Sequence, residues 1–321
     1  MTAARPAPWL RSLSPFLWSA VAGAAAYIIW SRLEHIDGDQ VWLQVQSLTP
    51  RAITLAALSC LLSYVFVGIY EGLAVHRASG RHVHAYSFLT AWIANPIAHM
   101  VGLAAVSGGA LRYRLYSGIG LSRRQIAGTV LLTTLPYVLG IAASITTVLL
   151  FESKVVAQLL HVPTVLARSV GVFITLALLG YVLLNHYRTE PVRLAALQFP
   201  LPGVRLTLLQ ILFGAAETML VATVLFLCMP EELELYWLQF IGAYMLALLL
   251  AQMSHVPAGI GVLEASMLVL LPAIPPGKLI GAMLAYRFIF EFVPLVLALV
   301  LLAAREGYVR GWWRAPSIAT D

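Results

Sequence analysis

Two glycine-rich interruptions inside apolar stretches constrain this chain most. Each combines small or helix-breaking residues with a charged residue three positions after a glycine. The residues are Gly108, Gly109 and Arg112 within 107–114, and Pro257, Gly259, Gly261 and Glu264 within 257–264. In lipid, irregular backbone is tolerated only where protein or a water-filled cavity satisfies its N–H and C=O groups. Matching interruptions in two halves of a chain are typical of a transport site. The sequence therefore predicts a transporter-like protein with backbone hinges at these glycines and at Pro257, where the glycines allow either bending or close backbone approach.

Composition places the chain in a membrane. Of its 321 residues, 60% are hydrophobic and 11% are charged, whereas a soluble domain carries about 25% charged residues. The apolar runs reach the ~20 residues that span a bilayer and show no alternation, which indicates helices. The formal charge of +6 comes from Arg-rich loops and both termini. In a membrane protein such charge usually sets the topology, so no nucleic-acid partner is expected. Cys60 and Cys228 are too few to suggest a disulfide framework or a metal cluster.

The distribution of Arg and Lys predicts that both termini are cytoplasmic. Residues 84–122 then return to the cytoplasmic side and residues 236–273 return to the outer side, each as a re-entrant helical hairpin. The halves 51–151 and 205–303 have opposite orientations, which is an inverted repeat within one integral membrane domain, 1–321. The expected fold is an all-α polytopic membrane protein with six full transmembrane helices plus two re-entrant hairpins. About eight simple spans are the alternative.

The six full spans are predicted at 13–31, 51–75, 125–151, 165–187, 205–228 and 279–303. The first of these is expected to be an uncleaved helix, because its apolar run is followed by further spans. Residues 41–48 carry spaced apolar side chains, which predicts a short interfacial helix between the first two spans.

Ionisable side chains within the apolar stretches are the candidate site. A charge at the membrane centre costs roughly 2.5–3.5 kcal/mol on insertion scales, so such groups usually face a cavity or one another. These residues are Glu71, His99, Arg112, Arg114, Glu217, His255, Glu264, Arg287 and Glu291. Arg287 and Glu291 are four residues apart and share a helix face, and Glu264 is expected to reach Arg287. This cluster is either a structural ion pair or the gate of a polar pathway.

Arg112 and Arg114 are the predicted phosphate ligands. A planar guanidinium suits bidentate phosphate contacts, so an anionic head group is the natural ligand. Ordinary anchoring at the cytoplasmic interface is the alternative. An Arg112→Ala variant is expected to reduce translocation of an anionic lipid and to keep its fold.

The other ionisable groups in the apolar stretches each have a structural interpretation as well as a functional one. Glu71 lies near the inner end of its span, where it is expected to be close enough to snorkel to the interface, or it belongs to the pathway. Glu217 lies in mid-span, where it has a functional role or hydrogen-bonds a neighbouring helix. His99 and His255 are lone histidines, typical of satisfied buried imidazoles as well as of ligands.

The sequence does not favour an enzyme. Its three aspartates, Asp37, Asp39 and Asp321, lie outside the predicted spans, whereas metal-dependent phosphoryl transfer needs clustered carboxylates. Neither a zinc-protease motif nor a P-loop is present. Neither a metal site nor a cofactor is therefore expected. An intramembrane lipid-modifying enzyme that uses His255 and Glu264 as acid and base is the rival from another class.

The two interruptions also resemble a known family. The blocks that carry the resemblance are 107–116 followed by Gly120-Leu121-Ser122, and 255–264 followed by Leu284-Ala285-Tyr286-Arg287. They resemble YbhN-type bacterial inner-membrane proteins, which are related to the transmembrane flippase region of lysylphosphatidylglycerol synthetases. The resemblance covers about residues 15–305. Glu71 stands where aspartate is expected in close relatives.

The resemblance implies a multi-pass protein of the bacterial cytoplasmic (inner) membrane that moves phospholipid. The aminoacyltransferase domain of the synthetases is not found in this sequence, so aminoacyl transfer is not carried over. The expected function is a flippase-like or scramblase-like phospholipid translocator, or a lipid-transport component, that acts on an anionic head group. A membrane scaffold for a separate lipid-processing protein is a further alternative, and a homo-oligomer is left open.

Overall fold

The computed structural model describes residues 37–101, 104–188, 192–194, 197–199, 202–230, 234, 236–254 and 256–309. Within these residues six helices are long and apolar enough to cross a membrane. The predicted all-α polytopic membrane fold is confirmed. The predicted first span, 13–31, lies outside the described residues. The six helices include Trp237–Ser254, which the sequence analysis assigned to a hairpin, so their membership differs from that of the six predicted spans.

The helices follow one another with short connections. In the first half of the chain they are α2 (Gly38–Ser47), α3 (Pro50–Ser79), α4 (His84–Val101), α5 (Ala104–Ser117), α6 (Arg123–Phe151), α7 (Ser153–Leu160) and α8 (Thr164–Tyr187). A short antiparallel ribbon of β1 (Val192–Leu194) and β2 (Leu197–Phe199) then leads to α9 (Val204–Cys228). The remaining elements are α10 (Trp237–Ser254), a 3₁₀ turn (Pro257–Gly259), α11 (Val262–Leu270), α12 (Pro276–Arg287), a π-helical turn (Phe288–Phe292) and α13 (Val293–Val309).

Local sequence signals set several helix ends. The Thr49 side chain accepts a hydrogen bond from an N–H in the first turn of α3, and Pro50 occupies the first helical position. Gly80 ends the same helix in the left-handed conformation. Ser122 and Gln125 form a capping box at the start of α6. These ends fix where the chain turns between its long apolar helices.

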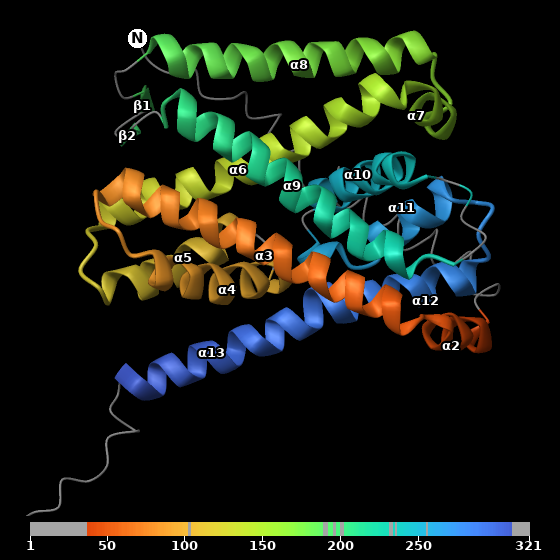
Figure 1. Cartoon of the computed structure of the whole chain (residues 1–321), viewed down its shortest axis with the longest axis horizontal. Helices are drawn as coiled ribbons and strands as arrows, with labels where there is room; N and C mark the ends of the chain where they lie inside the picture. Colours follow the sequence, from red (N-terminus) through yellow and green to blue (C-terminus); the bar gives the residue numbers. More distant parts are fainter. Residues whose placement is uncertain are drawn as a thin grey trace, which may run out of the picture.

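The long helices α3, α6 and α9 cross near the middle of the molecule, and two helix pairs lie toward opposite ends of its long axis (Figure 1). The pair α4–α5 lies at the left of the view, and the pair α10–α11 lies at the right. In the first pair the Tyr86 hydroxyl donates to the Leu115 carbonyl at 2.8 Å, so α4 and α5 are antiparallel. Within each pair the two helices pack against each other. Their re-entrant insertion in a membrane stays a prediction, and so does the inverted repeat.

Small residues permit the central helix crossing. A Cβ atom at Gly214 of α9 would lie 1.9 Å from the carbonyl oxygen of Pro136 in α6, and one at Gly140 would lie 2.2 Å from the Gly214 backbone. Such close backbone approach is typical of helix pairs in membranes. The crossing therefore holds α6 and α9 together at the level of the site described below.

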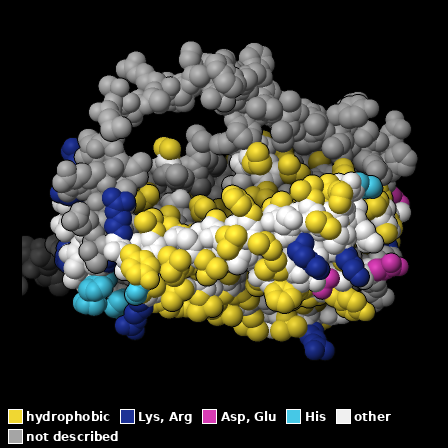
Figure 2. Space-filling view, turned by 90° about the horizontal axis from the view of Figure 1, so that it is seen from above, with side chains coloured by type: hydrophobic (Ala, Val, Ile, Leu, Met, Phe, Trp, Pro, Cys, Tyr) yellow, Lys and Arg dark blue, Asp and Glu magenta, His cyan; other side chains and the backbone are white. Residues whose placement is uncertain are grey.

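The outer surface is strongly apolar. Val165 and Phe173 of α8 have exposed fractions of 77% and 72%, although both are large hydrophobic residues. Figure 2 shows a broad field of hydrophobic side chains on this face, with most charged side chains toward its two ends. Such a surface suits lipid contact, with polar groups at the two membrane interfaces. The predicted interfacial segment 41–48 falls mainly within α2, which packs against α12.

Candidate functional site

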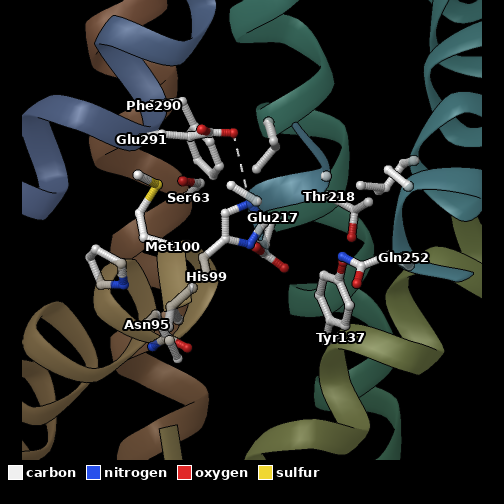
Figure 3. A pocket seen from close by; sticks show the side chains of 18 of the residues that line it. Ser63, Asn95, His99, Met100, Tyr137, Glu217, Thr218, Gln252, Phe290 and Glu291 are labelled. Carbon is white, nitrogen blue, oxygen red and sulfur yellow. Dashed lines mark hydrogen bonds and ion pairs between the residues drawn. The ribbon is translucent and has the colours of Figure 1, made fainter. Parts of the chain in front are cut away.

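A cavity of about 440 Å³ lies at the centre of the helix bundle. Residues of α3, α4, α5, α6, α9, α10, α11, α12 and the two irregular turns line it, so both helix pairs contribute. Its polar side chains include Ser63, Asn95, His99, Thr133, Tyr137, Glu217, Thr218, Gln252 and Glu291 (Figure 3). Polar groups gathered in the middle of an apolar bundle usually mark a substrate or ion pathway.

The first ion pair joins α5 to α3. The Arg112 Nε donates to Glu71 Oε1 at 2.9 Å, and Nη2 donates to Glu71 Oε2 at 2.7 Å. The Tyr116 hydroxyl, one turn further along α5, donates to Glu71 Oε1 at 2.9 Å. Arg112 Nη2 also lies 3.4 Å from the amide oxygen of Asn95 in α4. The carboxylate is thus held by three donor groups of one helix, and the pair ties the first hairpin to α3.

This geometry corrects two expectations. Glu71 does not snorkel to the interface, because its side chain is fully buried. Removing the Arg112 guanidinium would leave that carboxylate buried without a counter-charge, so Arg112→Ala is not expected to keep its fold intact. The predicted phosphate contact of Arg112 stays a prediction. Arg112 is one of the residues that line the cavity.

The second cluster joins α11 to α12 and the π-helical turn. Arg287 donates through Nε to Glu264 Oε1 at 2.5 Å and through Nη1 to Glu291 Oε2 at 2.7 Å. Nη1 also lies 3.2 Å from the Ala258 carbonyl oxygen. The second oxygen of Glu264 accepts the Gly261 N–H at 2.8 Å. The expected contacts of Arg287 with Glu264 and Glu291 are therefore present, and their gating role stays a prediction.

Backbone conformation distinguishes the two glycine-rich segments. Gly259 and Gly261 have φ values of 60° and 83°, and Ala258 between Pro257 and Gly259 has a φ of 52°. Left-handed residues of this kind turn the chain sharply and bring the Ala258 carbonyl toward Arg287. The irregular backbone of the second interruption is thus observed.

The first interruption has a different form. Gly108 and Gly109 lie inside α5, where no bend or left-handed residue is present at either position. A Cβ at Gly108 would lie 3.2 Å from the Ala98 Cβ, so this glycine permits the close approach of α5 to α4. Of the two roles expected for these glycines, close approach is therefore seen at Gly108, and no bend is present because the helix continues through both.

The remaining predicted residues are scattered. Arg114 is 58% exposed and pairs with Glu306 at 2.9 Å, and it is not one of the residues that line the cavity. His255 lies outside the described residues. His99 lines the cavity with its Nε2 3.8 Å from Glu291 Oε1. Glu217 lines it too, and its Oε2 atom has no hydrogen-bond partner in the described part of the chain.

Tyrosines form a part of the site that the sequence does not reveal. The cavity is lined by Tyr64, Tyr70, Tyr137, Tyr244 and Tyr286. The hydroxyls of Tyr244 and Tyr286 lie 3.0 Å apart, and Gln252 donates to the Tyr137 hydroxyl at 2.5 Å. An aromatic residue within an apolar run reads as core or interface, so no sequence signal singles these residues out.

Comparison with known proteins finds two relatives that match this chain over most of its length and over most of their own. No family model matches the chain. It is 28% identical over 294 residues to an uncharacterized protein of Synechocystis sp., with 89% of this chain and 91% of that protein covered. It is 26% identical over 288 residues to the inner membrane protein YbhN of Escherichia coli, with 86% and 87% covered.

A longer protein also matches. The chain is 25% identical over 299 residues to a phosphatidylglycerol lysyltransferase of Staphylococcus haemolyticus, with 91% of this chain but only 34% of that protein covered. The resemblance noted from the two sequence blocks is confirmed. The chain is a multi-pass membrane protein homologous to YbhN and to part of this lysyltransferase.

Proposed function

We propose that this membrane protein, a homologue of YbhN and of part of a phosphatidylglycerol lysyltransferase, moves phospholipid head groups between the two leaflets of the bacterial cytoplasmic membrane. One observation carries the proposal. A polar cavity lies at the centre of an apolar helix bundle, and it is lined by both helix pairs and by α3, α6, α9 and α12. A head group crossing a bilayer needs such a polar environment, while its acyl chains remain in lipid.

The cavity offers hydrogen-bonding groups for a phosphate-bearing head group. Glu71 occupies the Nε and Nη2 side of the Arg112 guanidinium, and the remaining Nη1 group lies beside Gly108. A phosphate oxygen can bind there without breaking the buried pair. In this proposal the predicted substrate, an anionic phospholipid, binds through its phosphate at this Nη1 group.

The second cluster supplies the moving part in this proposal. Arg287 holds Glu264 of the second hairpin and Glu291 of the π-helical turn, so exchange between these partners alters how the hairpin docks. A π-helical turn next to a functional site is a common arrangement. Left-handed Gly259 and Gly261 are the hinges on which the hairpin moves.

Leaflet exchange in liposomes that contain only this protein tests the function. Head-group-labelled phosphatidylglycerol, cardiolipin and phosphatidylethanolamine are compared, and the lipids are then analysed by mass spectrometry. Empty liposomes and liposomes with an unrelated helical membrane protein control for leakage and bilayer disturbance. Faster exchange with unchanged lipid masses is expected, and the most accelerated lipid identifies the head group.

Two other results would overturn the proposal. A new lipid mass without exchange would identify a lipid-modifying enzyme. A scaffold would be identified if the protein gave no exchange and no new lipid mass but co-purified from the native membrane with a stoichiometric partner.

A further inference from the structure

Glu217 differs from the other membrane-embedded glutamates. Glu71, Glu264 and Glu291 each accept hydrogen bonds from an arginine. Glu217 lies in the middle of α9 with an exposed fraction of 9%, and it lines the cavity. Its Oε2 atom is buried and has no hydrogen-bond partner among the described residues. The carboxyl group is thus placed beside the pathway with an unused oxygen.

The surroundings of Glu217 offer little positive charge. Its electrostatic neighbours on α3, α6 and α10 are the tyrosines Tyr64, Tyr70, Tyr137 and Tyr244. The charged or titratable side chains that face the same cavity from α4, α5 and the π-helical turn are His99, Arg112 and Glu291. Of these, Arg112 alone carries a fixed positive charge, and Glu71 already neutralises it. No described residue of the cavity lining therefore supplies an uncommitted counter-ion to Glu217.

An ionised carboxylate without a donor or counter-ion is costly in such surroundings, and binding a proton removes the cost. We propose that Glu217 is a reversible proton-binding site whose protonation couples lipid movement to the proton gradient. The proton passes from water on one side to Oε2 and leaves to water on the other side, and no other bond changes. The coupling rests on the proposed function, whereas the proton site does not.

Polar side chains line the cavity near Glu217. Figure 3 shows Glu217, Tyr137 and Gln252 around the same part of the cavity. The Tyr137 hydroxyl accepts the Gln252 amide, which leaves the hydroxyl proton free to be donated elsewhere. Gln252 is itself exposed. On the other side of the cavity the imidazole of His99 lies between Glu217 and Glu291 in this view. In the proposal these groups relay the proton to the carboxyl.

Infrared difference spectroscopy tests the proton site directly. The purified full-length protein is compared between acid and alkaline pH, and a protonated carboxyl band is expected. The band should be lost in Glu217→Gln and kept in Glu152→Gln, a control outside the cavity whose carboxylate accepts a hydrogen bond from Gln239. Glu217→Asp should keep the band at a shifted position. This variant replaces Glu217→Gln in the test if Glu217→Gln is not monodisperse. An unchanged band in Glu217→Gln or an unshifted one in Glu217→Asp would overturn the proposal.

Leaflet exchange across a pH series tests the coupling. The wild-type rate is expected to depend on pH, and Glu217→Gln is expected to lose that dependence while Glu152→Gln retains it. A pH dependence that survives in Glu217→Gln contradicts the coupling. Loss of exchange for amine head groups alone at every pH would make Glu217 an ammonium ligand and overturn it too. If the wild type exchanges no lipid but the infrared band behaves as expected, the translocation function fails while the proton site stands.

Discussion

The two hairpins are anchored by ion pairs of opposite design. In the first, the long helix α3 carries the carboxylate and the hairpin carries the arginine, with side-chain exposures of 0% for Glu71 and 7% for Arg112. In the second, α12 carries the arginine and the hairpin carries the carboxylate, with exposures of 15% for Arg287 and 14% for Glu264. The second cluster also contains the extra carboxylate Glu291.

The two ion pairs differ in charge balance and in how many of their hydrogen-bonding atoms have a partner. Glu71 and Arg112 balance each other, and Tyr116 completes the carboxylate's hydrogen bonding. Arg287 serves two carboxylates, while its Nη2 atom is buried without a hydrogen-bond partner in the described residues. The Glu71 carboxylate is fully engaged by its donors, whereas the second cluster contains an excess carboxylate and a spare donor. We therefore expect the first pair to hold the fold and the second to permit movement.

Breaking the first pair gives the largest expected effect. Arg112→Ala should lower the free energy of unfolding by about 3–5 kcal/mol, because Glu71 is left buried and uncompensated. The double variant Glu71→Leu/Arg112→Met is the matched control and should lose much less, since no lone charge remains. Chemical denaturation of the purified protein in detergent measures both. A single variant as stable as the double variant would contradict the view that the Glu71–Arg112 pair holds the fold.

Removing one carboxylate from the second cluster should have a smaller effect on stability. Glu291→Gln leaves Arg287 paired with Glu264, so the expected loss is about 1.5 kcal/mol, the lower end for a hydrogen bond to a charged group. The same variant should change the leaflet exchange rate more than its stability loss explains. A change in stability equal to that of Arg112→Ala would show that the two clusters do not differ.

Alanine substitution compares the backbones of the two hairpins. Gly261→Ala should destabilise the protein by roughly 1–2 kcal/mol, because its φ of 83° is unfavourable for a residue with a Cβ atom. Gly109→Ala should stabilise it by up to about 1 kcal/mol, because it lies within a helix and its Cβ would be in ordinary contact, 3.8 Å from Val130. Thermal unfolding of both variants measures the difference. Equal shifts of the same sign would contradict the assigned conformations.

The smallest effect is expected at Arg114. Its pair with Glu306 is largely exposed at the arginine, so Arg114→Ala should change stability by less than about 1 kcal/mol. Raising the salt concentration should shrink the difference further, since exposed charges are screened. A salt-independent loss comparable with that of Arg112→Ala would mean that Arg114 also belongs to the buried anchoring.

Much of the architecture was predictable because it depends on local properties. Length and hydropathy of the apolar runs identify membrane helices, and five of the six predicted spans coincide with described helices. The pairing of Arg287 with Glu291 follows from helical periodicity alone. The contact of Glu264 with Arg287 was expected because only one short helix separates the two residues. Each of these features involves residues that are close in the chain.

Other features of the site were decided by packing between distant segments. The partner of Arg112 is Glu71, which is 41 residues away, and neither the sequence spacing nor the residue types reveal that contact. Glycines at positions 108 and 109 look like helix breakers in the sequence, but a helix forms there, with Gly108 facing Ala98 of α4 and Gly109 facing Val130 of α6.

The sequence by itself determined the membrane environment, the helices and the charged residues that need partners. The tertiary structure alone decided which charged residues have a partner. It left Glu217 with an unused oxygen and placed tyrosines around the cavity that Glu217 lines. The physical reason is that hydropathy and helical period act within a segment, whereas burial and hydrogen-bond satisfaction depend on the neighbours that packing brings together.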